Sequence, residues 1–323
     1  MHSTSKSQGS SGSSHSQVLS PGRADIHSHT HYSGFNKVFF VPFPESVTPP
    51  DKMVDAAVKK GLDVLCVTDH NEIEGAFRAQ RYAIENRLPV DVVAGEEIRT
   101  ADGEVIGLFL QECIPECLSA EETIDLIHDQ GGLAVAPHPF SYRCHSLGTK
   151  IGELRLDGVE VLNGAHRDRY VNRLAENIAS LTRMARTGGS DTHSPRMLGD
   201  TFTEFPGRSA DDLYRAIKRS ETTPGGKHAP LGDWILWSME IAHGVGKRLI
   251  ASFKEKELRS GLGSNSYSDD PLVRIDMMRR HNRVIAMGGC IVFLLTPLPL
   301  VCGVVGEVWI RREGYRKWEE FKP

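Results

Sequence analysis

His27, His29 and His31 occupy alternate positions in the stretch DIHSHTHYSG. Alternate side chains of a β-strand point to the same face, so a strand here would present all three imidazoles together. A lone histidine on an apolar face is usually a core residue, whereas an H-x-H pair before a turn favours one metal ion bound by both rings. Asp25 falls on the same face, where it could bind the metal or, more in keeping with its position, orient an imidazole from behind.

Four more clusters of histidine or carboxylate residues follow apolar runs that are typical of buried strands. They are Thr68–His70 after LDVLCV, Gly95–Glu97 after LPVDVVA, Pro137–Phe140 after LAVA, and Gly188–Pro195, which contains Asp191 and His193. Each cluster alone has an ordinary structural explanation, such as helix capping by Asp69 or Asn71. Five clusters at the ends of predicted strands together favour a single shared site.

The donor types in these clusters narrow the chemistry. Mixed imidazole and carboxylate ligands favour Zn²⁺, Mn²⁺ or Fe²⁺ over Ca²⁺ and over ions that prefer thiolates. Seven or more candidate ligands exceed the need of one tetrahedral ion, so we expect two or three divalent ions. Such ions lower the pKa of a water molecule towards neutrality and neutralise charge on a phosphoryl group, which favours phosphoester hydrolysis.

The elements that must position these residues alternate between short apolar runs and amphipathic stretches from Arg23 to about Thr223. Helices are predicted at 49–61, 71–86, 119–132, 168–180 and 209–220, the third with a capping box of Ser119 and Glu122. This β/α rhythm, repeated about seven times, predicts a mostly parallel sheet that is open or closed into a barrel. Active groups of such folds lie at the C-terminal ends of the strands.

The composition fits a globular protein. The chain has 323 residues, a formal net charge of −4 and 39% hydrophobic residues, which suffices for one substantial domain with additions. The charge balance provides no global attraction for nucleic acid. Six cysteines without a CxxC pair indicate reduced thiols in a cytosolic setting.

The two ends of the chain differ from its centre. Residues 1–22 are rich in Ser and Gly, so we expect a disordered tail, and they lack the basic and apolar regions of a secretory signal. Residues 224–283 contain an amphipathic stretch, Trp234–Ile250, and a linker, Ser260–Asp270. The amphipathic stretch either lies on a membrane surface or packs on the catalytic domain.

Val284–Val305 carries no charge over 22 residues and as a helix would be long enough to cross a bilayer core. Arginines flank it on both sides, and Pro297 and Pro299 would kink it. We expect a transmembrane segment here and a short basic tail at 306–323, with a buried helix or strand pair as the alternative. The protein would then be membrane-associated with a cytoplasmic catalytic domain, or cytoplasmic if the segment is not inserted.

In chain order the motifs DIHSHT, TDH, GEE, HP and SDTH resemble the signature of the PHP family (polymerase and histidinol phosphatase). The resemblance covers Arg23 to Thr223, and the stretch from Gly107 to Phe140 is similar to short, stand-alone members. It implies a distorted (β/α)7 barrel and a phosphoesterase site with two or three metal ions.

The resemblance also implies a role for each motif residue. The first ion would be bound by His27, His29 and Asp191, Glu97 would bridge, His138 would bind a second ion, and His70 and His193 a third. Relatives often carry a further ligand near Gly34 and Phe35 that is missing here, so the third ion would depend on His31. Relatives often have histidine in the strand after GEE, where this chain offers Glu104 as a ligand or a turn residue.

Substrate and proton-transfer groups are expected on the same rim. Arg143 is the preferred phosphate-binding residue because a guanidinium binds phosphate through two hydrogen bonds. Arg167 and Asn163 are further candidates for substrate binding. His145 could protonate the leaving oxygen, as could His166, and Asp69 is a candidate catalytic carboxylate.

The expected substrate is a small phosphorylated molecule, possibly a nucleotide. Nuclease action on short oligonucleotides, or removal of a 3′-phosphate from a nucleoside bisphosphate, is the alternative. The chain lacks a basic patch interleaved with aromatic residues, so no stable nucleic-acid complex is expected. A non-catalytic metal-binding module at a membrane is the alternative from a different class.

Overall fold

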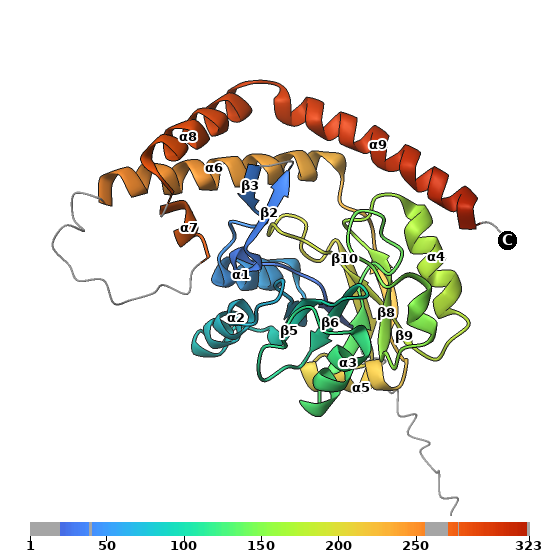
Figure 1. Cartoon of the computed structure of the whole chain (residues 1–323). Helices are drawn as coiled ribbons and strands as arrows, with labels where there is room; N and C mark the ends of the chain where they lie inside the picture. The colour runs from blue at the N-terminus through green and yellow to red at the C-terminus, as the bar shows by residue number, and fades with distance from the viewer. Residues whose placement is uncertain (1–19, 39–40, 256–270, 277, 322–323) are drawn as a thin grey trace, which may run out of the picture.

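The computed structural model describes residues 20–38, 41–255, 271–276 and 278–321. The linker expected at Ser260–Asp270 and most of the tail expected at 1–22 lie outside this range. In Figure 1 an α/β body carries a layer of long C-terminal helices above it. The five histidine and carboxylate motifs all belong to the α/β body.

Nine strands form one sheet in the order β11-β10-β1-β4-β5-β6-β7-β8-β9. Their bounds are β1 Gly22–Asp25, β4 Val64–Val67, β5 Asp91–Arg99, β6 Glu104–Leu108, β7 Leu133–Ala136, β8 Gly158–Asn163, β9 Ala185–Gly189, β10 Thr201–Phe205 and β11 Thr223–Gly226. The β1–β4, β4–β5, β7–β8 and β8–β9 pairs are parallel. The other four pairs are antiparallel, because β6 runs opposite to its neighbours β5 and β7, and β10 runs opposite to its neighbours β1 and β11.

Side-chain hydrogen bonds join the two ends of this sheet. Thr203 Oγ1 on β10 donates to Gly188 O on β9 at 2.8 Å and accepts from Gly188 N at 2.9 Å. Thr222 Oγ1 donates to Arg186 O at 2.9 Å. These contacts nearly close the sheet, so the expectation of a distorted α/β barrel is confirmed.

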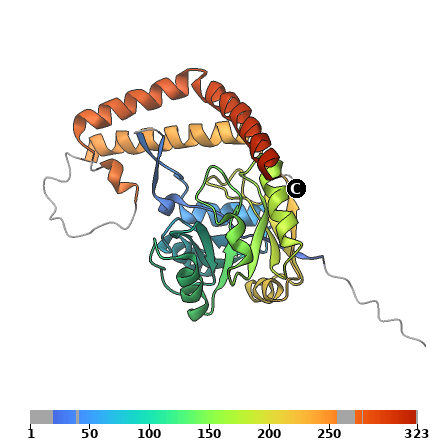
Figure 2. The same ribbon diagram turned by 45° about the vertical axis from the view of Figure 1, so that its right-hand side comes forward.

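Helices pack around the outside of the barrel (Figure 2). They are α1 Pro50–Lys60, α2 Glu74–Glu85, α3 Ala120–Asp129, α4 Arg169–Ala179 and α5 Ala210–Lys218, and two short 3₁₀ turns span His31–Ser33 and Gly148–Gly152. The capping box expected for α3 is present. Helix α2 begins later than expected, because Asn71 has a φ of 49° and its side chain accepts from Arg99 N instead of capping the helix.

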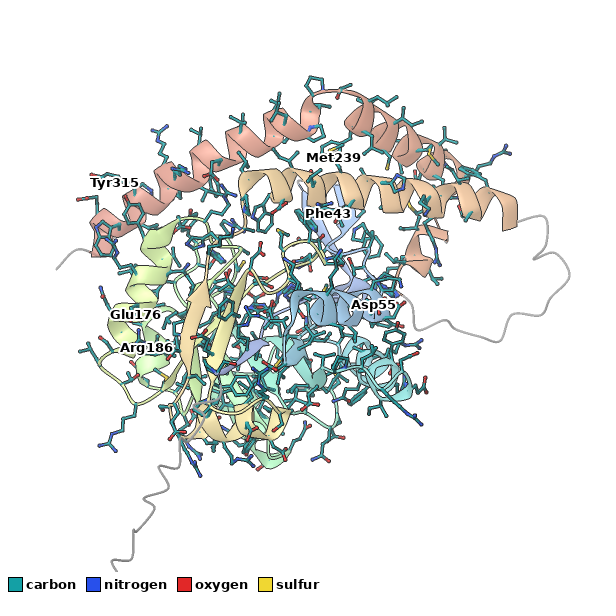
Figure 3. The ribbon with its side chains drawn as sticks, turned by 180° about the vertical axis from the view of Figure 1, so that it is seen from behind. Phe43, Asp55, Glu176, Arg186, Met239 and Tyr315 are labelled. Atoms are coloured by element: carbon teal, nitrogen blue, oxygen red, sulfur yellow. The ribbon has the colours of Figure 1, made fainter. Side chains whose placement is uncertain are left out.

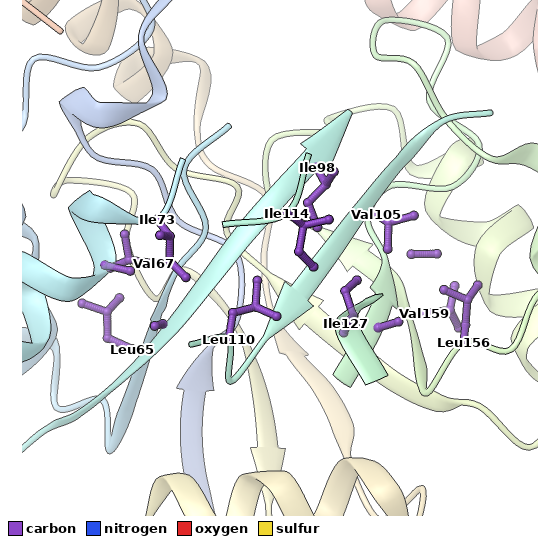
Figure 4. Packing of buried hydrophobic residues seen from close by; sticks show 14 of the residues in the cluster. Leu65, Val67, Ile73, Ile98, Val105, Leu110, Ile114, Ile127, Leu156 and Val159 are labelled. Carbon is purple, nitrogen blue, oxygen red and sulfur yellow. The ribbon is translucent and has the colours of Figure 1, made fainter. Parts of the chain in front are cut away.

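Both faces of strand β4 are buried, as expected for a strand covered on two sides. Leu65 and Val67 join the cluster packed under the outer helices (Figure 4). Val64 and Cys66 face the other way and join the cluster that contains Leu213 of α5. Alternation along one strand therefore supplies both layers of the core.

The remaining elements lie above the barrel. A separate hairpin, β2 Phe35–Val38 and β3 Val41–Pro44, reaches towards helix α6 Leu231–Glu255, and Figure 3 shows Phe43 below Met239. Helix α7 spans Val273–Asp276, α8 Arg280–Leu295 runs beside α6, and α9 Leu298–Phe321 descends to α4 (Figure 1). The stretch Trp234–Ile250 thus forms part of α6, which packs against α8 and α9.

The expected transmembrane segment, 284–305, is not one helix. Thr296 adopts an extended conformation before Pro297, as residues before proline tend to, and the axes of α8 and α9 differ by 78°. Among the described helices none is by itself both long and apolar enough to span a bilayer. The α8–α9 pair meets that standard only when its two halves are taken together.

Asp157, before β8, offers a test of the barrel's electrostatics. It accepts from His128 Nε2 and Lys218 Nζ at 2.8 Å and from Ala134 N at 2.9 Å. Although burial acts to raise it, the pKa of Asp157 is held below its usual range by these three donors. Such a carboxylate stabilises the fold above its unfolded-state pKa of about 4, and that contribution disappears as the pH falls through its lower folded-state value.

We predict that Asp157→Asn lowers the free energy of unfolding by about 1–2 kcal/mol at pH 7, and that the difference narrows as the pH falls below about 4. Urea unfolding of the full chain at several pH values measures it. Asp125→Asn is the control, because Asp125 is exposed and forms a surface ion pair with Arg155 at 3.4 Å. A deficit for Asp157→Asn that does not vary with pH would contradict the assignment.

Candidate metal centre

The carboxylate of Glu97 lies at the centre of the histidine clusters. Its Oε2 is 3.3 Å from His27 Nε2, 3.4 Å from His29 Nε2 and 3.1 Å from His70 Nδ1. Its Oε1 is 3.0 Å from His138 Nε2. Four imidazoles from three separate segments of the chain therefore meet one carboxylate that is 1% exposed.

Asp191 provides a second carboxylate to the same group. Its Oδ1 is 3.6 Å from His27 Nε2 and 3.4 Å from His29 Nε2. Its Oδ2 accepts from Asn163 Nδ2 at 3.1 Å. Asp191 has a φ of 50°, a left-handed conformation that the turn after β9 imposes. The backbone thus bears local strain where it directs this carboxylate into the cluster.

Glu45, which follows β3, brings a third carboxylate that the sequence analysis did not identify. Its Oε2 is 3.2 Å from His70 Nε2 and 4.0 Å from His193 Nε2. Trp237 of α6 donates from Nε1 to Glu45 O at 3.2 Å. The hairpin therefore places a carboxylate beside the two histidines predicted for a third ion, where the chain lacks the ligand expected near Gly34.

Hydrogen bonds fix how His29 presents its nitrogens. Ser33 Oγ donates to Asp69 Oδ1 at 2.8 Å, so it accepts from His29 Nδ1, which lies 2.9 Å away. The proton of neutral His29 then resides on Nδ1, and the Nε2 lone pair faces Glu97 and Asp191. That Nε2 is buried and has no hydrogen-bond partner in the part of the chain that the structure describes, as expected for a metal ligand.

His27 is oriented in the same way by Glu160, a second residue that the sequence analysis missed. Glu160 Oε1 lies 3.2 Å from His27 Nδ1, and its Oε2 accepts from His138 N at 2.8 Å and from Asn163 Nδ2 at 2.8 Å. A Cβ at position 189 would lie 2.5 Å from both Glu160 Oε1 and His27 Cβ, so only glycine fits there. One signal was available, namely an acid in the middle of the apolar strand GVEVLN.

Asp25 and Asp69, two acids predicted for the site, accept hydrogen bonds from backbone N–H and hydroxyl groups. Asp25 accepts from the backbone N–H groups of Gly199 at 2.8 Å, Ser190 at 3.0 Å and His27 at 3.3 Å, so it holds backbone rather than an imidazole. Asp69, expected to be catalytic, accepts from Thr30 N, Thr30 Oγ1 and Ser33 Oγ. Its oxygens are engaged, and it acts on the site by positioning Ser33 behind His29.

The two additional candidate ligands, His31 and Glu104, differ in their relation to the cluster. His31 does not continue a strand, because β1 ends at Asp25; it opens a 3₁₀ turn and stacks on Tyr32 at 4.6 Å. Glu104 is buried with its Oε2 4.0 Å from His138 Nε2. Burial and the neighbouring charge of Glu97 raise the pKa of Glu104 to about 7. Glu104 thus lies in the cluster, whereas no grouping of three donors among the described residues contains His31.

The groups that would hold ions have donor atoms within 4.8 Å of one another. The four that consist of His, Asp and Glu residues are His27–His29–Glu97, His27–His138–Asp191, His70–Glu97–Glu104 and His29–His70–His193. Imidazole and carboxylate donors in this proportion fit borderline divalent cations. The residues present therefore fit the divalent ions that the fold family implies.

Burial and neighbouring charges shift the pKa values of the buried histidines in different directions. Burial lowers the pKa of His29 to about 4, and burial together with the charge of His29 lowers that of His193 to about 3. Burial also acts to lower the pKa of His138, but its hydrogen bond and charge interaction with Glu97 raise it to about 9. His29 and His193 are therefore neutral near pH 7, the state in which imidazole binds a metal.

The predicted substrate-binding residues are placed differently from one another. Arg143 and His145 are exposed on the loop after His138. Asn163 is buried, and its amide holds Asp191 and Glu160, so it supports the centre rather than facing a substrate. Arg167 is not free to bind phosphate, because its guanidinium donates to Glu307 Oε2 at 2.8 Å and to Ala229 O at 2.7 Å.

The fold and these clustered donors define a barrel protein with a candidate metal centre. The PHP domain family matches residues 25–133, and the PHP-associated family matches residues 169–222. Two proteins of Methanocaldococcus jannaschii are similar. Uncharacterized protein MJ1587 is 51% identical over 48% of this chain and 90% of its own, and uncharacterized protein MJ1588 is 35% identical over 38% of this chain and 99% of its own. The chain belongs to the PHP family.

A solved structure is also similar, that of a two-domain protein from Bacteroides vulgatus containing a predicted PHP-like metal-dependent phosphoesterase. The identity is 20% and the TM-score 0.49. The match covers 64% of each chain, so this chain spans slightly less than two thirds of that protein.

Because Glu160 orients His27, we predict that Glu160→Gln weakens divalent metal binding about 10- to 100-fold. Competition with a chromophoric chelator, using Mn²⁺ and Zn²⁺ and the full chain, measures the affinity. Glu153→Gln is the matched control, because Glu153 is exposed. Equal affinities for the two variants would show that the contact between Glu160 and His27 does not support the centre.

Proposed function

We propose that this protein is a metal-dependent phosphoesterase that hydrolyses a small phosphorylated substrate. The observation that carries the proposal is the convergence of His27, His29, His70 and His138 on Glu97, with Asp191 beside them. Membership of the PHP family supports it.

The ion-holding residues would be His27, His29, His70, Glu97, His138, Asp191 and His193, with Glu45 and Glu104 as further carboxylates. Divalent ions held there would supply activation of a water molecule and neutralisation of charge on a phosphoryl group. The protein contributes fixed ligand geometry: Glu160 and Ser33 set the Nδ1 protons of His27 and His29, and Asn163 fixes Asp191.

Arg143 is the cation we assign to the substrate phosphate. It is exposed on the loop after His138, and burial and then the charge of Arg143 lower the pKa of the neighbouring His166 well below its usual range. A guanidinium at the rim binds a phosphate through charge-assisted hydrogen bonds. His145 on the same loop is the candidate proton donor for the leaving oxygen.

We predict that Asp191→Asn lowers kcat/KM on the order of 100-fold or more, because the neutral amide weakens both metal binding and charge stabilisation. Hydrolysis of p-nitrophenyl phosphate, bis(p-nitrophenyl) phosphate and a nucleoside 3′,5′-bisphosphate is measured with the Mn²⁺-loaded full chain. Preference for the bisphosphate or the diester would favour the nucleotide alternative.

Asp129→Asn, at an exposed position on α3, is the matched control and should retain wild-type activity. A wild-type protein that binds metal but hydrolyses none of these esters would overturn the enzyme proposal and favour a non-catalytic metal-binding module. Full activity in Asp191→Asn would refute the assignment of this residue.

We also propose that the bend between α8 and α9 rests on the surface of an anionic membrane. Large apolar side chains are exposed along both helices, among them Ile285, Leu295, Leu300, Val305 and Val308. Exposed arginines at 279, 280, 311 and 312 flank this apolar surface and match anionic headgroups. The buried Arg283 does not contribute, because it donates to Ser252 O at 3.2 Å.

Flotation of the full chain with phosphatidylglycerol-containing vesicles tests this contact. Because each apolar side chain contributes about 1.5–3 kcal/mol on burial, we predict that Leu295→Glu weakens vesicle binding roughly 10-fold or more. Leu181→Glu is the matched control, because Leu181 is 85% exposed on the barrel. Equal loss in both variants, or no flotation of the wild type, would contradict the proposal.

A further inference from the structure

A second group of soft and borderline donors adjoins the Glu97 cluster. Donor atoms of His138, Cys144 and His166 lie within 4.8 Å of one another. The rings of His138 and His166 are 5.2 Å apart between centroids. Neither Cys144 nor His166 belongs to the ligand set that the PHP motifs imply, so the mechanism proposed above leaves both unused as ligands.

His166 is the observation that demands an explanation. Its side chain is fully buried, yet neither ring nitrogen has a hydrogen-bond partner among the described residues, and the same holds for His138 Nδ1. An unsatisfied buried polar group costs about 1–3 kcal/mol, so native proteins provide a partner. Three such nitrogens at one place indicate that the partner is a bound species rather than another side chain.

The backbone holds the three residues in this arrangement. The loop after His138 is tied by Ser141, whose Oγ accepts from Cys144 N at 2.9 Å and from Arg143 N at 3.1 Å. Asn163 Oδ1 accepts from His166 N at 3.0 Å, which fixes the turn after β8. His138 has a φ of 26°, a strained value for a non-glycine residue. Two neighbouring strands therefore present one donor group.

The surroundings set the charge of the thiol. Burial, followed by the negative charges of Asp191 and Glu104, raises the pKa of Cys144 to about 12. Without a cation the thiol is therefore neutral near pH 7. A divalent cation reverses this balance, because thiols that bind zinc-like ions are deprotonated outright.

We propose that Cys144 and His166, together with His138, bind a thiophilic divalent cation such as Zn²⁺. On binding, the Cys144 thiol releases its proton to solvent, and the resulting thiolate and the imidazole nitrogens bind the ion. Thiolate and imidazole donors select Zn²⁺ over Mn²⁺. This site goes beyond the proposed phosphoesterase function, since it requires metal binding but no hydrolysis.

Cobalt substitution of the full chain provides a test. Co²⁺ bound by a thiolate gives a sulfur-to-metal charge-transfer band in the near ultraviolet, which imidazole and carboxylate ligands do not give. The wild type should show this band, and Cys144→Ser should lose it. Cys117→Ser, at an exposed cysteine, is the matched control and should retain the band.

Alkylation of the unmodified protein covers the case in which Cys144→Ser does not fold. Excess Zn²⁺ should slow iodoacetamide labelling of Cys144 at least 10-fold, as measured by peptide mass spectrometry, and leave labelling of Cys117 unchanged. Absence of the charge-transfer band in the wild type, its persistence in Cys144→Ser, or equal labelling with and without Zn²⁺ would each overturn the proposal. Phosphoesterase activity does not enter these measurements, so the two proposals can fail separately.

Discussion

The organisation of the barrel depends on one buried carboxylate, that of Glu97. Imidazoles buried without counter-charge are costly, and so is a buried carboxylate, so the two must be placed together. Although burial acts to raise it, the pKa of Glu97 is held well below its usual range by His70 and His27. Strand β5 delivers this carboxylate because adjacent side chains alternate: Glu96 points away and accepts from Ile114 N at 2.9 Å.

Several residues with strained backbone or unusually close packing surround this carboxylate. Asp191 and His138 both have positive φ, and Glu160 approaches His27 only because position 189 has no side chain. Residues in such conformations cost about 1–3 kcal/mol each and persist only where the surroundings fix them. Here the fixing contacts are those of Asp25 with backbone N–H groups and those of the Asp69 and Asn163 side chains. Asp25 and Asp69, which the sequence placed at the metal, therefore hold in place the loops that carry the candidate ligands.

The sequence analysis succeeded where chemistry and local pattern coincide. The H-x-H pair, GEE and SDTH combine ligand residue types with strand ends, and the structure brings these side chains together around Glu97. It failed for Glu45 and Glu160, because the residues next to a single acid in a hairpin or strand do not indicate which distant side chain it will contact. It also failed for Arg167, since pairing with Glu307, 140 positions away, depends on how α9 packs. For the uncharged run 284–305 the sequence predicted a transmembrane segment kinked by Pro297 and Pro299; the structure has two helices bent by 78°, and neither is by itself long and apolar enough to span a bilayer.

The contact between the loop after His138 and the C-terminal helix α9 has a consequence for biosynthesis. Tyr142 donates its hydroxyl proton to Ile310 O at 2.7 Å, across 168 positions of sequence. Every strand of the barrel has been synthesised once the ribosome passes Gly226, whereas Ile310 follows on the order of ten seconds later. The loop that carries Arg143 and Cys144 therefore lacks its final support throughout that interval.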